Sequence, residues 1–238
     1  MSEVNLLRQY PRAKRQLDKP RSLDPENVRK AREFGEAYFD GKREEGYGGY
    51  RYDGRWVPIA KDIVAHFGLK SGDRVLDVGC AKGFLVKDLI SVCPGLQVYG
   101  VDISQYALRH AETEAQGRMA AATADCLPFP DDAFDLVLSI NTLHNLDRPQ
   151  LVTALQEMER LAPGRGYVQV DAYTNDAERD LFLGWVLTAL TFLKPDEWRD
   201  LFAEAGYRGD YYWTILETDP AWNDFGALNE AAPSLGVQ

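Results

Sequence analysis

The chain has 238 residues, 45% of them hydrophobic and 27% charged, a composition that supports a globular core and excludes disorder throughout. Its formal net charge is −10, and an acidic body repels phosphate backbones, so nucleic acid is not an expected partner. No uncharged stretch is longer than Leu181–Leu193, which is too short to cross a bilayer, so we expect no membrane-spanning helix.

The first residues and the cysteines indicate the cellular compartment. The N-terminus has neither an apolar signal core nor a cleavage site, so we expect no export. The three cysteines, Cys80, Cys93 and Cys126, form neither a paired framework nor a metal-spaced cluster. We therefore expect reduced thiols, a cytoplasmic protein and no bound metal.

Residues 1–55 are predicted to form an N-terminal basic extension and a cap or lid rich in tyrosine and glycine. Residues 1–32 hold nine Lys and Arg against four Asp and Glu, in an otherwise acidic chain. A helix is expected over Pro25–Tyr38, after an Asp24 cap. The loop Gly41–Gly54 carries five glycines and three tyrosines, Tyr47, Tyr50 and Tyr52. This loop is either a lid with glycine hinges or a packed turn, and both interpretations stay open.

From Trp56 a regular alternation of helices and strands begins. Helical patterns cover residues 56–67, 84–92, 106–116, 148–161 and 176–205, the last broken near Pro195. Runs typical of strands cover residues 74–79, 97–102, 121–125, 134–140, 167–173 and 207–218. This order predicts an α/β fold with a doubly wound, mostly parallel sheet of about six to seven strands. We expect residues 56–218 to form this domain and residues 219–238 a C-terminal tail.

Polar residues recur where the predicted strands end. Ligands of open α/β sheets bind outside the carboxyl ends of the strands, so this edge is the expected ligand cleft. In strand order, the residues found there are Asp77, Gly79 and Gly83, then Asp102, then Asp125, then Asn141 and His144, then Asp171 and Tyr173. Together they predict one binding site.

The loop after the first strand distinguishes between classes of nucleotide ligand. Gly79 and Gly83 have the spacing G-x-x-x-G, whereas a dinucleotide fingerprint is G-x-G-x-x-G, which disfavours a dinucleotide oxidoreductase. Asp77 at the strand end would repel a pyrophosphate and suits a positively charged group such as an amine or a sulfonium. Asp102 lies near the position at which an acid binds ribose hydroxyls in such folds. Asp125 lies at the position where an adenine amino group would need a hydrogen-bond acceptor.

Four stretches in this order resemble the class I S-adenosylmethionine-dependent methyltransferases: residues 75–83 (VLDVGCAKG), 99–104 (YGVDIS), 124–130 (ADCLPFP) and 134–140 (FDLVLSI). The resemblance covers about residues 56–218. Together, the four stretches are similar to the small-molecule branch called methyltransferase-11-like. It implies a Rossmann-like methyltransferase fold, S-adenosylmethionine as cofactor and S-adenosylhomocysteine as product. It also implies cofactor contacts at Asp77, Gly79, Cys80, Ala81, Gly83, Asp102, Ile103, Asp125, Cys126 and Asn141.

One residue departs from the family pattern. The family often has glycine where Ala81 stands. If that position needs a positive φ, alanine costs about 1–2 kcal/mol there, and if φ is negative the change is harmless. The departure concerns the detail of the loop and leaves the resemblance intact.

The resemblance implies methyl transfer to an oxygen or nitrogen of a small-molecule acceptor by in-line displacement. His144 is the candidate general base, because imidazole titrates near neutral pH, and its alternative role is to shape the loop. Aromatic faces attract sulfonium and ammonium groups, so the tyrosine loop is a further candidate for contact with such a group. Acceptor contacts are expected from Tyr47, Tyr50, Tyr52, Asp171 and Tyr173.

Two other classes of function stay open. The basic residues within 1–32 suit a methyltransferase that acts on a protein or RNA. Alternatively, the chain is a non-catalytic module that binds the cofactor without turnover. The uncharged stretch Leu181–Leu193 is expected to be a buried helix, packed against the sheet, the acceptor pocket or another subunit, so an oligomer is also compatible.

Overall fold

The computed structural model describes residues 1–11, 22 and 24–215. Within these ranges six strands form one sheet in the order β3-β2-β1-β4-β5-β6, and every neighbouring pair is parallel. The strands are β1 (Arg74–Val78), β2 (Gln97–Asp102), β3 (Met119–Ala121), β4 (Leu136–Ile140), β5 (Gly166–Asp171) and β6 (Asp210–Thr214). The predicted doubly wound, parallel α/β fold is confirmed.

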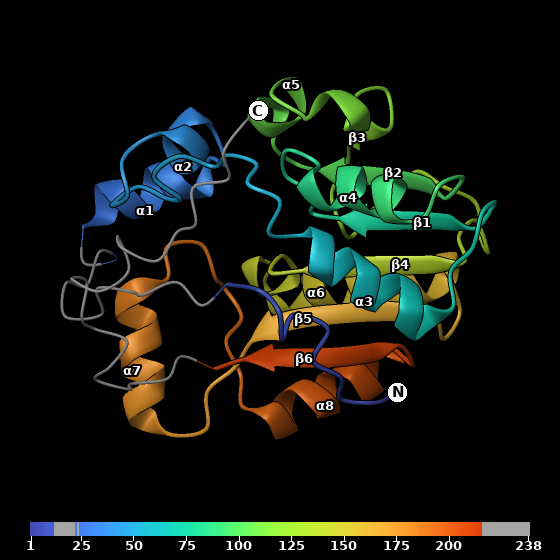
Figure 1. Cartoon of the computed structure of the whole chain (residues 1–238). Coiled ribbons are helices and arrows are strands. Elements are labelled where there is room, and N and C mark those ends of the chain that lie inside the picture. Colours follow the sequence, from blue (N-terminus) through green and yellow to red (C-terminus); the bar gives the residue numbers. More distant parts are fainter. Residues whose placement is uncertain (12–21, 23, 216–238) are drawn as a thin grey trace.

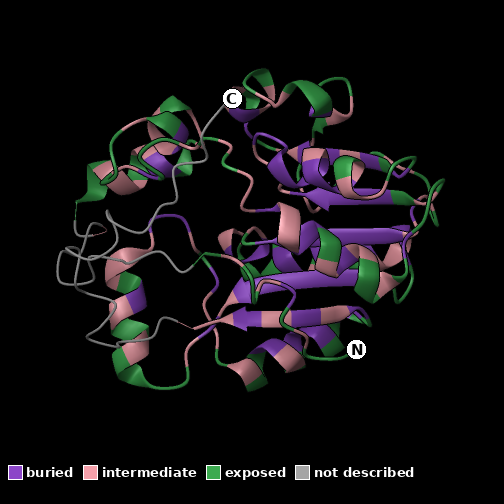
Figure 2. Cartoon of the chain, in the orientation of Figure 1, coloured by how far each residue is buried: buried purple, intermediate pink, exposed green. Residues whose placement is uncertain are grey.

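Helices cover both faces of this sheet (Figure 1). On one face α3 (Val57–Phe67) packs beside α4 (Phe84–Val92), and on the other α6 (Arg148–Leu161) packs beside α8 (Pro195–Ala205). Because both of its faces are covered, the central sheet is largely buried (Figure 2), and every residue of β4 is buried. This explains why the central strands β1 and β4 read as apolar runs rather than as alternating patterns.

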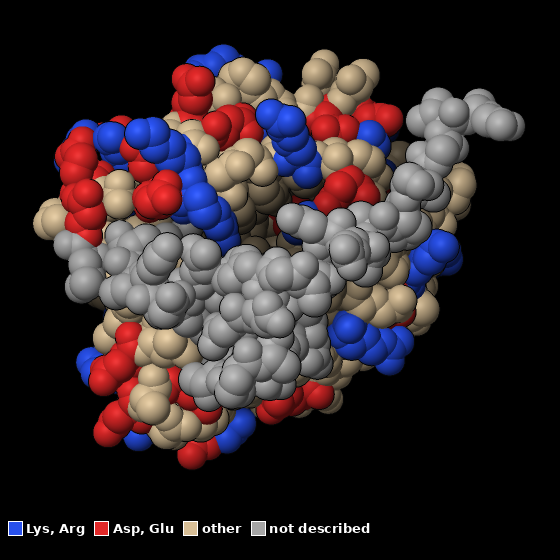
Figure 3. All heavy atoms as spheres, turned by 60° about the vertical axis from the view of Figure 1, so that its left-hand side comes forward, with Lys and Arg blue, Asp and Glu red and all other residues tan. Residues whose placement is uncertain are grey.

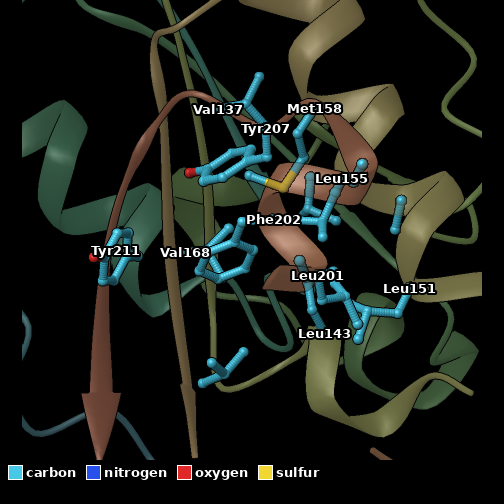
Figure 4. Close-up of a cluster of buried hydrophobic side chains, with 14 of the residues drawn as sticks. Val137, Leu143, Leu151, Leu155, Met158, Val168, Leu201, Phe202, Tyr207 and Tyr211 are labelled. Carbon is cyan, nitrogen blue, oxygen red and sulfur yellow. The ribbon is translucent and has the colours of Figure 1, made fainter. Parts of the chain in front are cut away.

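Two apolar clusters, one on each face, hold the layers together. The cluster shown in Figure 4 joins Leu155 and Met158 of α6 to Leu201 and Phe202 of α8 and to Val168 of β5. The apolar residues of α6 recur every three or four positions, which places them on one stripe facing the sheet. The cluster on the opposite face includes Ile59, Ile63, Leu85 and Leu89.

Short elements lie near the carboxyl ends of the strands, where the arrows in Figure 1 point toward α1, α2 and α7. Their bounds are α1 (Pro25–Arg32), α2 (Glu36–Asp40), α5 (Gln105–Arg109), α7 (Asp176–Trp185) and the 3-10 turns η1 (Thr113–Ala115) and η2 (Leu143–Asn145). The described N-terminal region thus combines two short helices, α1 and α2, with loops, as predicted for the cap.

The single helix predicted over Pro25–Tyr38 is wrong, because the chain forms α1 and α2 with a break between them. Phe34 at the break has φ +47°, and its carbonyl accepts a 2.5 Å hydrogen bond from Ser104 Oγ. Gly35 then forms the N-cap of α2. A contact with a distant strand end therefore interrupts a locally favourable helix.

The helix predicted through Leu181–Leu193 is also wrong. α7 ends at Trp185, and α8 begins with Pro195 at its first position, which proline favours. Between them, the N–H groups of Leu190 and Thr191 donate to the carbonyl of His144. These bonds tie the segment to η2 instead of continuing a helix.

Three further predicted boundaries differ from the structure. The helix over 106–116 is only α5 followed by η1, and the third strand ends at Ala121 because a bridge between Thr123 and Cys126 closes a turn. The last strand begins at Asp210, since Gly206 ends α8 in the left-handed conformation. Residues 216–238, which include the predicted tail, lie outside the described residues.

The start of the chain runs beside β6 and then reaches α3. The N–H of Val4 donates to the carbonyl of Tyr211, and the Tyr167 hydroxyl donates to the carbonyl of Val4. Arg8 forms an ion pair with Asp62 of α3. Apart from its start, residue 22 and the α1 residues, the basic extension lies outside the described part of the chain.

Candidate cofactor and acceptor site

The carboxyl ends of β1, β2 and β4 border a cavity of about 320 Å³, here called the cofactor cavity. It lies where the strand order reverses between β1 and β4, the position at which open α/β sheets bind ligands. Figure 3 shows the hollow on this side of the molecule, with charged side chains around it. The predicted cofactor residues that line the cavity are Asp77, Gly79, Cys80, Ala81, Asp102, Ile103, Asp125 and Asn141.

Two glycines allow the sharp turn after β1. Gly79 has φ +86°, and a Cβ there would lie 2.0 Å from Thr142 Oγ1, so a larger residue would clash. Gly83 has φ +75° at the N-cap of α4, where a Cβ would meet Ala115 and Met119. Gly83 is not among the residues that line the cavity, and its contribution is to the shape of the loop.

Ala81, which stands where the family often has glycine, adopts the costly conformation with a positive φ. Its φ is +49°, in the left-handed region that favours glycine. The Ala81 N–H donates to Asp102 Oδ2 at 2.8 Å, which holds the strained loop against the end of β2.

We expect Ala81→Gly to raise the free energy of unfolding by about 0.5–1 kcal/mol. Glycine relieves about 1–2 kcal/mol of left-handed strain and costs about 0.5–1 kcal/mol in the entropy of the unfolded chain. Urea unfolding monitored by circular dichroism measures the difference. Ala81→Val is the comparison variant with the opposite expected effect, because a β-branched side chain is more strained at positive φ. A glycine variant less stable than the native chain would contradict the strain assigned to Ala81.

Asp77 is a buried carboxylate that faces the cofactor cavity. Its residue is only 4% exposed, and the described residues supply no hydrogen bond or ion pair to its side chain. Burial, together with the nearby Asp102, raises the pKa of Asp77 to about 7. The cavity therefore offers a carboxylate whose ionised form a bound cation would stabilise.

Asp102 at the end of β2 is held differently. Its Oδ1 accepts from the N–H of Ser104 at 2.7 Å, and its Oδ2 accepts from Ala81. Burial raises the pKa of Asp102 even though these two bonds favour the ionised form. A carboxylate has about four lone-pair sites, so both oxygens keep capacity to accept bonds from a ligand. Ile103 follows on the rim of the cavity and is 59% exposed.

The predicted residues after the third strand separate in the structure. Asp125 lines the cofactor cavity together with Thr123 and Ala124. Cys126 is exposed and is not among the lining residues, since its N–H turns back to the carbonyl of Thr123.

An aromatic wall from the cap closes the cofactor cavity opposite the strands. The ring of Tyr50 stacks on Phe84 of α4 with centroids 4.6 Å apart, and Tyr47 lies 4.5 Å from Tyr50. Phe39 of α2 stacks with both Tyr47 and Tyr106. The tyrosine loop therefore packs in this structure, and its aromatic faces border the cavity.

An ion pair between a buried lysine and a partly exposed carboxylate connects this wall to the loop after β1. Lys82 is 7% exposed, and its Nζ lies 2.6 Å from Asp40 Oδ2 and 2.9 Å from the carbonyl oxygen of Tyr50. The Tyr106 hydroxyl donates to the same Asp40 oxygen, and the Tyr50 N–H donates to Asp40 Oδ1. These contacts, here called the Lys82–Asp40 latch, fix the position of the wall.

A second cavity of about 360 Å³ adjoins the first, here called the acceptor cavity. The two cavities share Asn141, which has φ +55° at the end of β4, and part of the aromatic wall. Polar and charged residues that line the acceptor cavity include Arg43, Arg51, Arg55, His144, Asp171 and Thr188.

His144 and Asp171 meet at the acceptor cavity. His144 is only 4% exposed, and its Nδ1 accepts a hydrogen bond from the Asp171 N–H at 3.2 Å. The Asp171 Oδ2 lies 3.4 Å from the same nitrogen. Residues from β5 and η2 thus combine into one polar pair, 27 positions apart in the chain.

Two of the predicted acceptor residues lie outside both cavities. The Tyr52 hydroxyl donates to Asp88 of α4 at 2.6 Å, which fastens the tyrosine loop to the domain. The Tyr173 ring packs against Phe192 with centroids 4.8 Å apart.

Comparison with known proteins identifies the domain. Residues 75–166 match a family model described as a methyltransferase domain. This match supports a class I methyltransferase domain in the chain. An uncharacterized methyltransferase of Schizosaccharomyces pombe is 28% identical over 188 residues, which cover 70% of this chain and 71% of that relative. A demethylmenaquinone methyltransferase of Symbiobacterium thermophilum is 29% identical over 61% of this chain and 60% of its own length.

A solved structure shows the same fold. A chain of the Haloferax volcanii complex between the Trm112 methyltransferase activator and its methyltransferase superposes with a TM-score of 0.51 at 23% identity. The match covers 63% of this chain and 68% of that chain. Several further curated relatives are matched over about half of their own length.

Several residues that line or support the two cavities escaped prediction. Asp40, Phe34 and Phe39 come from the cap, and Arg43 and Arg51 from the tyrosine loop. Lys82, between the two glycines of the loop after β1, could have indicated a contact with an acidic residue of the cap, because a buried ammonium group needs a partner.

Among the described residues, no group of three His, Cys, Asp or Glu side chains is placed to hold a metal ion. No described helix is long and apolar enough to span a membrane.

Proposed function

We propose that the chain transfers the methyl group of S-adenosylmethionine to a small organic acceptor. The observation that carries the proposal is the buried Asp77 carboxylate, which faces the cofactor cavity without a cation beside it in the described part of the chain. The cofactor's α-ammonium group supplies such a cation. A cavity of this size lies in the range of small-molecule sites.

The other residues around the cavity fit the rest of the cofactor. The lone pairs of Asp102 that remain after its two backbone bonds suit ribose hydroxyls. Asp125 suits the adenine amino group, and Ile103 offers an apolar surface beside the ring. Backbone groups of the loop after β1, from Gly79 to Ala81, border the methionine portion.

When bound, the cofactor supplies a methyl group activated by the sulfonium charge. The chain's own residues would align the acceptor with that group and exclude water. Asn141 and Tyr50 lie on the boundary between the two cavities, so they would define the path of approach. Alignment alone supplies roughly 7–11 kcal/mol in well-oriented reactions, so the site needs no further chemical group for a reactive acceptor.

The acceptor cavity supports a small molecule over a macromolecule. It is bounded by the cap on one side and by η2 and residues 182–188 on the other. The relative from Symbiobacterium thermophilum is named for a small-molecule substrate, demethylmenaquinone. The alternative of an RNA or protein acceptor rests on the basic extension, of which Arg8 already forms an ion pair with Asp62.

Thermal unfolding with S-adenosylmethionine, S-adenosylhomocysteine and NAD tests the proposal. A ligand at about 100 times its dissociation constant adds about 2.7 kcal/mol, which is roughly 5–10 °C for a chain of this size. We expect this shift with both adenosyl ligands and none with NAD. A shift with NAD alone, or none with any ligand, would contradict the proposed cofactor.

The affinity for S-adenosylhomocysteine should depend on pH through Asp77. With a pKa of about 7 in the unliganded protein, only about a tenth of this carboxyl is ionised at pH 6 and most of it at pH 7.5. Calorimetric titration should therefore show roughly 5–10-fold tighter binding at pH 7.5. Asp77→Asn is the control, because its affinity should not vary over this range, and a flat profile in the native chain would contradict the role of Asp77.

A further inference from the structure

The acceptor cavity is rich in cationic groups, although the chain as a whole carries a net charge of −10. Three arginines of the tyrosine loop and its C-terminal flank line it: Arg43, Arg51 and Arg55. Asp171 is the one carboxylate among its described lining residues. A cavity with this balance favours an anionic ligand.

The three arginines differ in how they are held. Arg55 is neutralised by its ion pair with Asp53. Arg43 is fixed in place, since its Nη1 donates to the carbonyl oxygens of Gly46 and Tyr47 and its guanidinium lies over the Trp185 ring at 5.1 Å. Arg51 is exposed, and the described residues offer it no ion pair. Arg51 is therefore the guanidinium most available to a ligand.

His144 presents a donor to this cavity. Its Nδ1 accepts the Asp171 N–H, so in the neutral ring the proton lies on Nε2. If the ring gains a second proton, Nδ1 faces Asp171 Oδ2 at 3.4 Å and Nε2 still carries its own. In both states Nε2, the nitrogen left for a ligand, donates. A general base at Nε2 would require the other tautomer and the loss of the bond from Asp171.

We infer that the acceptor is a small organic acid and that the methyl group goes to its carboxylate oxygen. The inference rests on the proposed methyl transfer and names its substrate class. The carboxylate oxygen forms a bond to the methyl carbon while the methyl–sulfur bond breaks, and that electron pair stays on sulfur. The products are a methyl ester and neutral S-adenosylhomocysteine, and no proton is released.

The chemistry of the cavity fits a carboxylate better than a hydroxyl. A hydroxyl acceptor must lose a proton, and His144 is turned to donate rather than to accept. A carboxylate is already an anion at neutral pH, so it needs positioning and no base. Arg51 and His144 supply donors for it, and the aromatic rings of Tyr38, Tyr47 and Trp185 supply a surface for a flat apolar body.

The first test compares acids with their matched amides. Phenylacetate, 3-phenylpropionate and trans-cinnamate are titrated against protein saturated with S-adenosylhomocysteine, beside phenylacetamide, 3-phenylpropanamide and cinnamamide. We expect the acids to bind at least tenfold more tightly, and Arg51→Gln to reduce that preference about tenfold. Arg208→Gln is the control, since Arg208 is similarly exposed and pairs with Glu159, away from both cavities. Equal binding of acids and amides would overturn the inference.

The second test identifies the bond formed. Protein is incubated with the same probes and methyl-tritiated S-adenosylmethionine, and the products are treated with alkali. A methyl ester releases tritiated methanol, whereas ether, N-methyl and C-methyl products keep the label. Volatile label from the acids is the expected result, and label retained in a base-stable product would overturn it. Binding of S-adenosylhomocysteine, measured beforehand, separates failure of this inference from failure of the proposed cofactor.

The role of His144 has its own readout. His144→Gln keeps an N–H donor and should retain more ester formation than His144→Leu. At saturating S-adenosylmethionine, which removes the effect of Asp77 on cofactor affinity, ester formation should stay level from pH 6.5 to 8.5. Equal loss in both variants, together with a rate that rises with pH at saturating cofactor in the native chain, would identify a general base and overturn the acid assignment.

Discussion

Asp77→Asn should weaken the binding of S-adenosylhomocysteine by about 100-fold at pH 7.5. The substitution keeps the shape of the side chain and removes the negative charge that faces the cofactor cavity. Losing a charged hydrogen-bond partner in a buried site costs about 1.5–3 kcal/mol, which corresponds to roughly 10–100-fold in affinity, and full burial places Asp77 at the upper end. Isothermal titration calorimetry measures the change.

The same variant should make the unliganded protein more stable at neutral and alkaline pH. Because the pKa of Asp77 is raised from 3.8 to about 7, the folded chain holds this proton more tightly than the unfolded chain. The free energy of unfolding therefore falls as pH rises from about 4 to 7, by about 4 kcal/mol in total for this group. Asp77→Asn removes that penalty, so its advantage over the native chain should be largest above pH 7.

Asp200→Asn is the matched control for both effects, since Asp200 is exposed on α8. It should change neither the affinity nor the pH dependence of unfolding. If Asp77→Asn bound the ligand as tightly as the native chain, Asp77 would not hold the α-ammonium group.

Lys82→Met should both destabilise the chain and weaken its binding of the cofactor. The substitution leaves Asp40 without its buried cation and frees the Tyr50 carbonyl. Breaking a buried ion pair from one side costs about 3–5 kcal/mol, and the partial exposure of Asp40 together with its bonds to Tyr106 and Tyr50 lowers that to about 2–3 kcal/mol. We expect the melting temperature to fall by roughly 5–10 °C.

Affinity should follow stability because Lys82 holds the aromatic wall of the cofactor cavity. We expect S-adenosylhomocysteine to bind roughly tenfold more weakly to Lys82→Met, a loss of about 1.4 kcal/mol. Lys70→Met is the control, because Lys70 forms an exposed ion pair with Asp73 on the surface.

A double-mutant cycle with Asp40→Asn separates a latch from a general loss of packing. The two substitutions should be less than additive by at least about 1 kcal/mol if the residues act on each other directly. Additive effects would show that Lys82 and Asp40 contribute independently, and that the wall is held by its ring contacts alone.

Much of the strand end of the site was predictable from residue order. Asp77 lies near the end of one apolar run and Asp102 closes the next, and parallel strands bring the ends of such runs to one edge without further information. The glycine spacing of 79 and 83 indicates a tight turn before a helix, and both residues have positive φ in the structure. These features depend on short segments, in which backbone preferences and apolar periodicity act locally.

The cap resisted prediction for a physical reason. The break at Phe34 depends on Ser104, 70 positions away, and the Lys82–Asp40 latch joins residues 42 positions apart. No local preference encodes such contacts, because a buried charge or carbonyl is satisfied by whichever partner the folded chain brings near it.

His144 shows the same difference between what residue order predicts and what contacts between distant segments decide. Its place after β4 follows from the strand pattern, and so does the place of Asp171 at the end of β5. Which ring nitrogen faces Asp171, and therefore which one faces a ligand, depends on the packing of η2 against β5. Residue order thus predicted the fold, the resemblance to the methyltransferases and the edge of the sheet at which the two cavities lie. Packing between distant segments established the walls of the two cavities and the direction of their hydrogen bonds, because those contacts form only when the chain closes on itself.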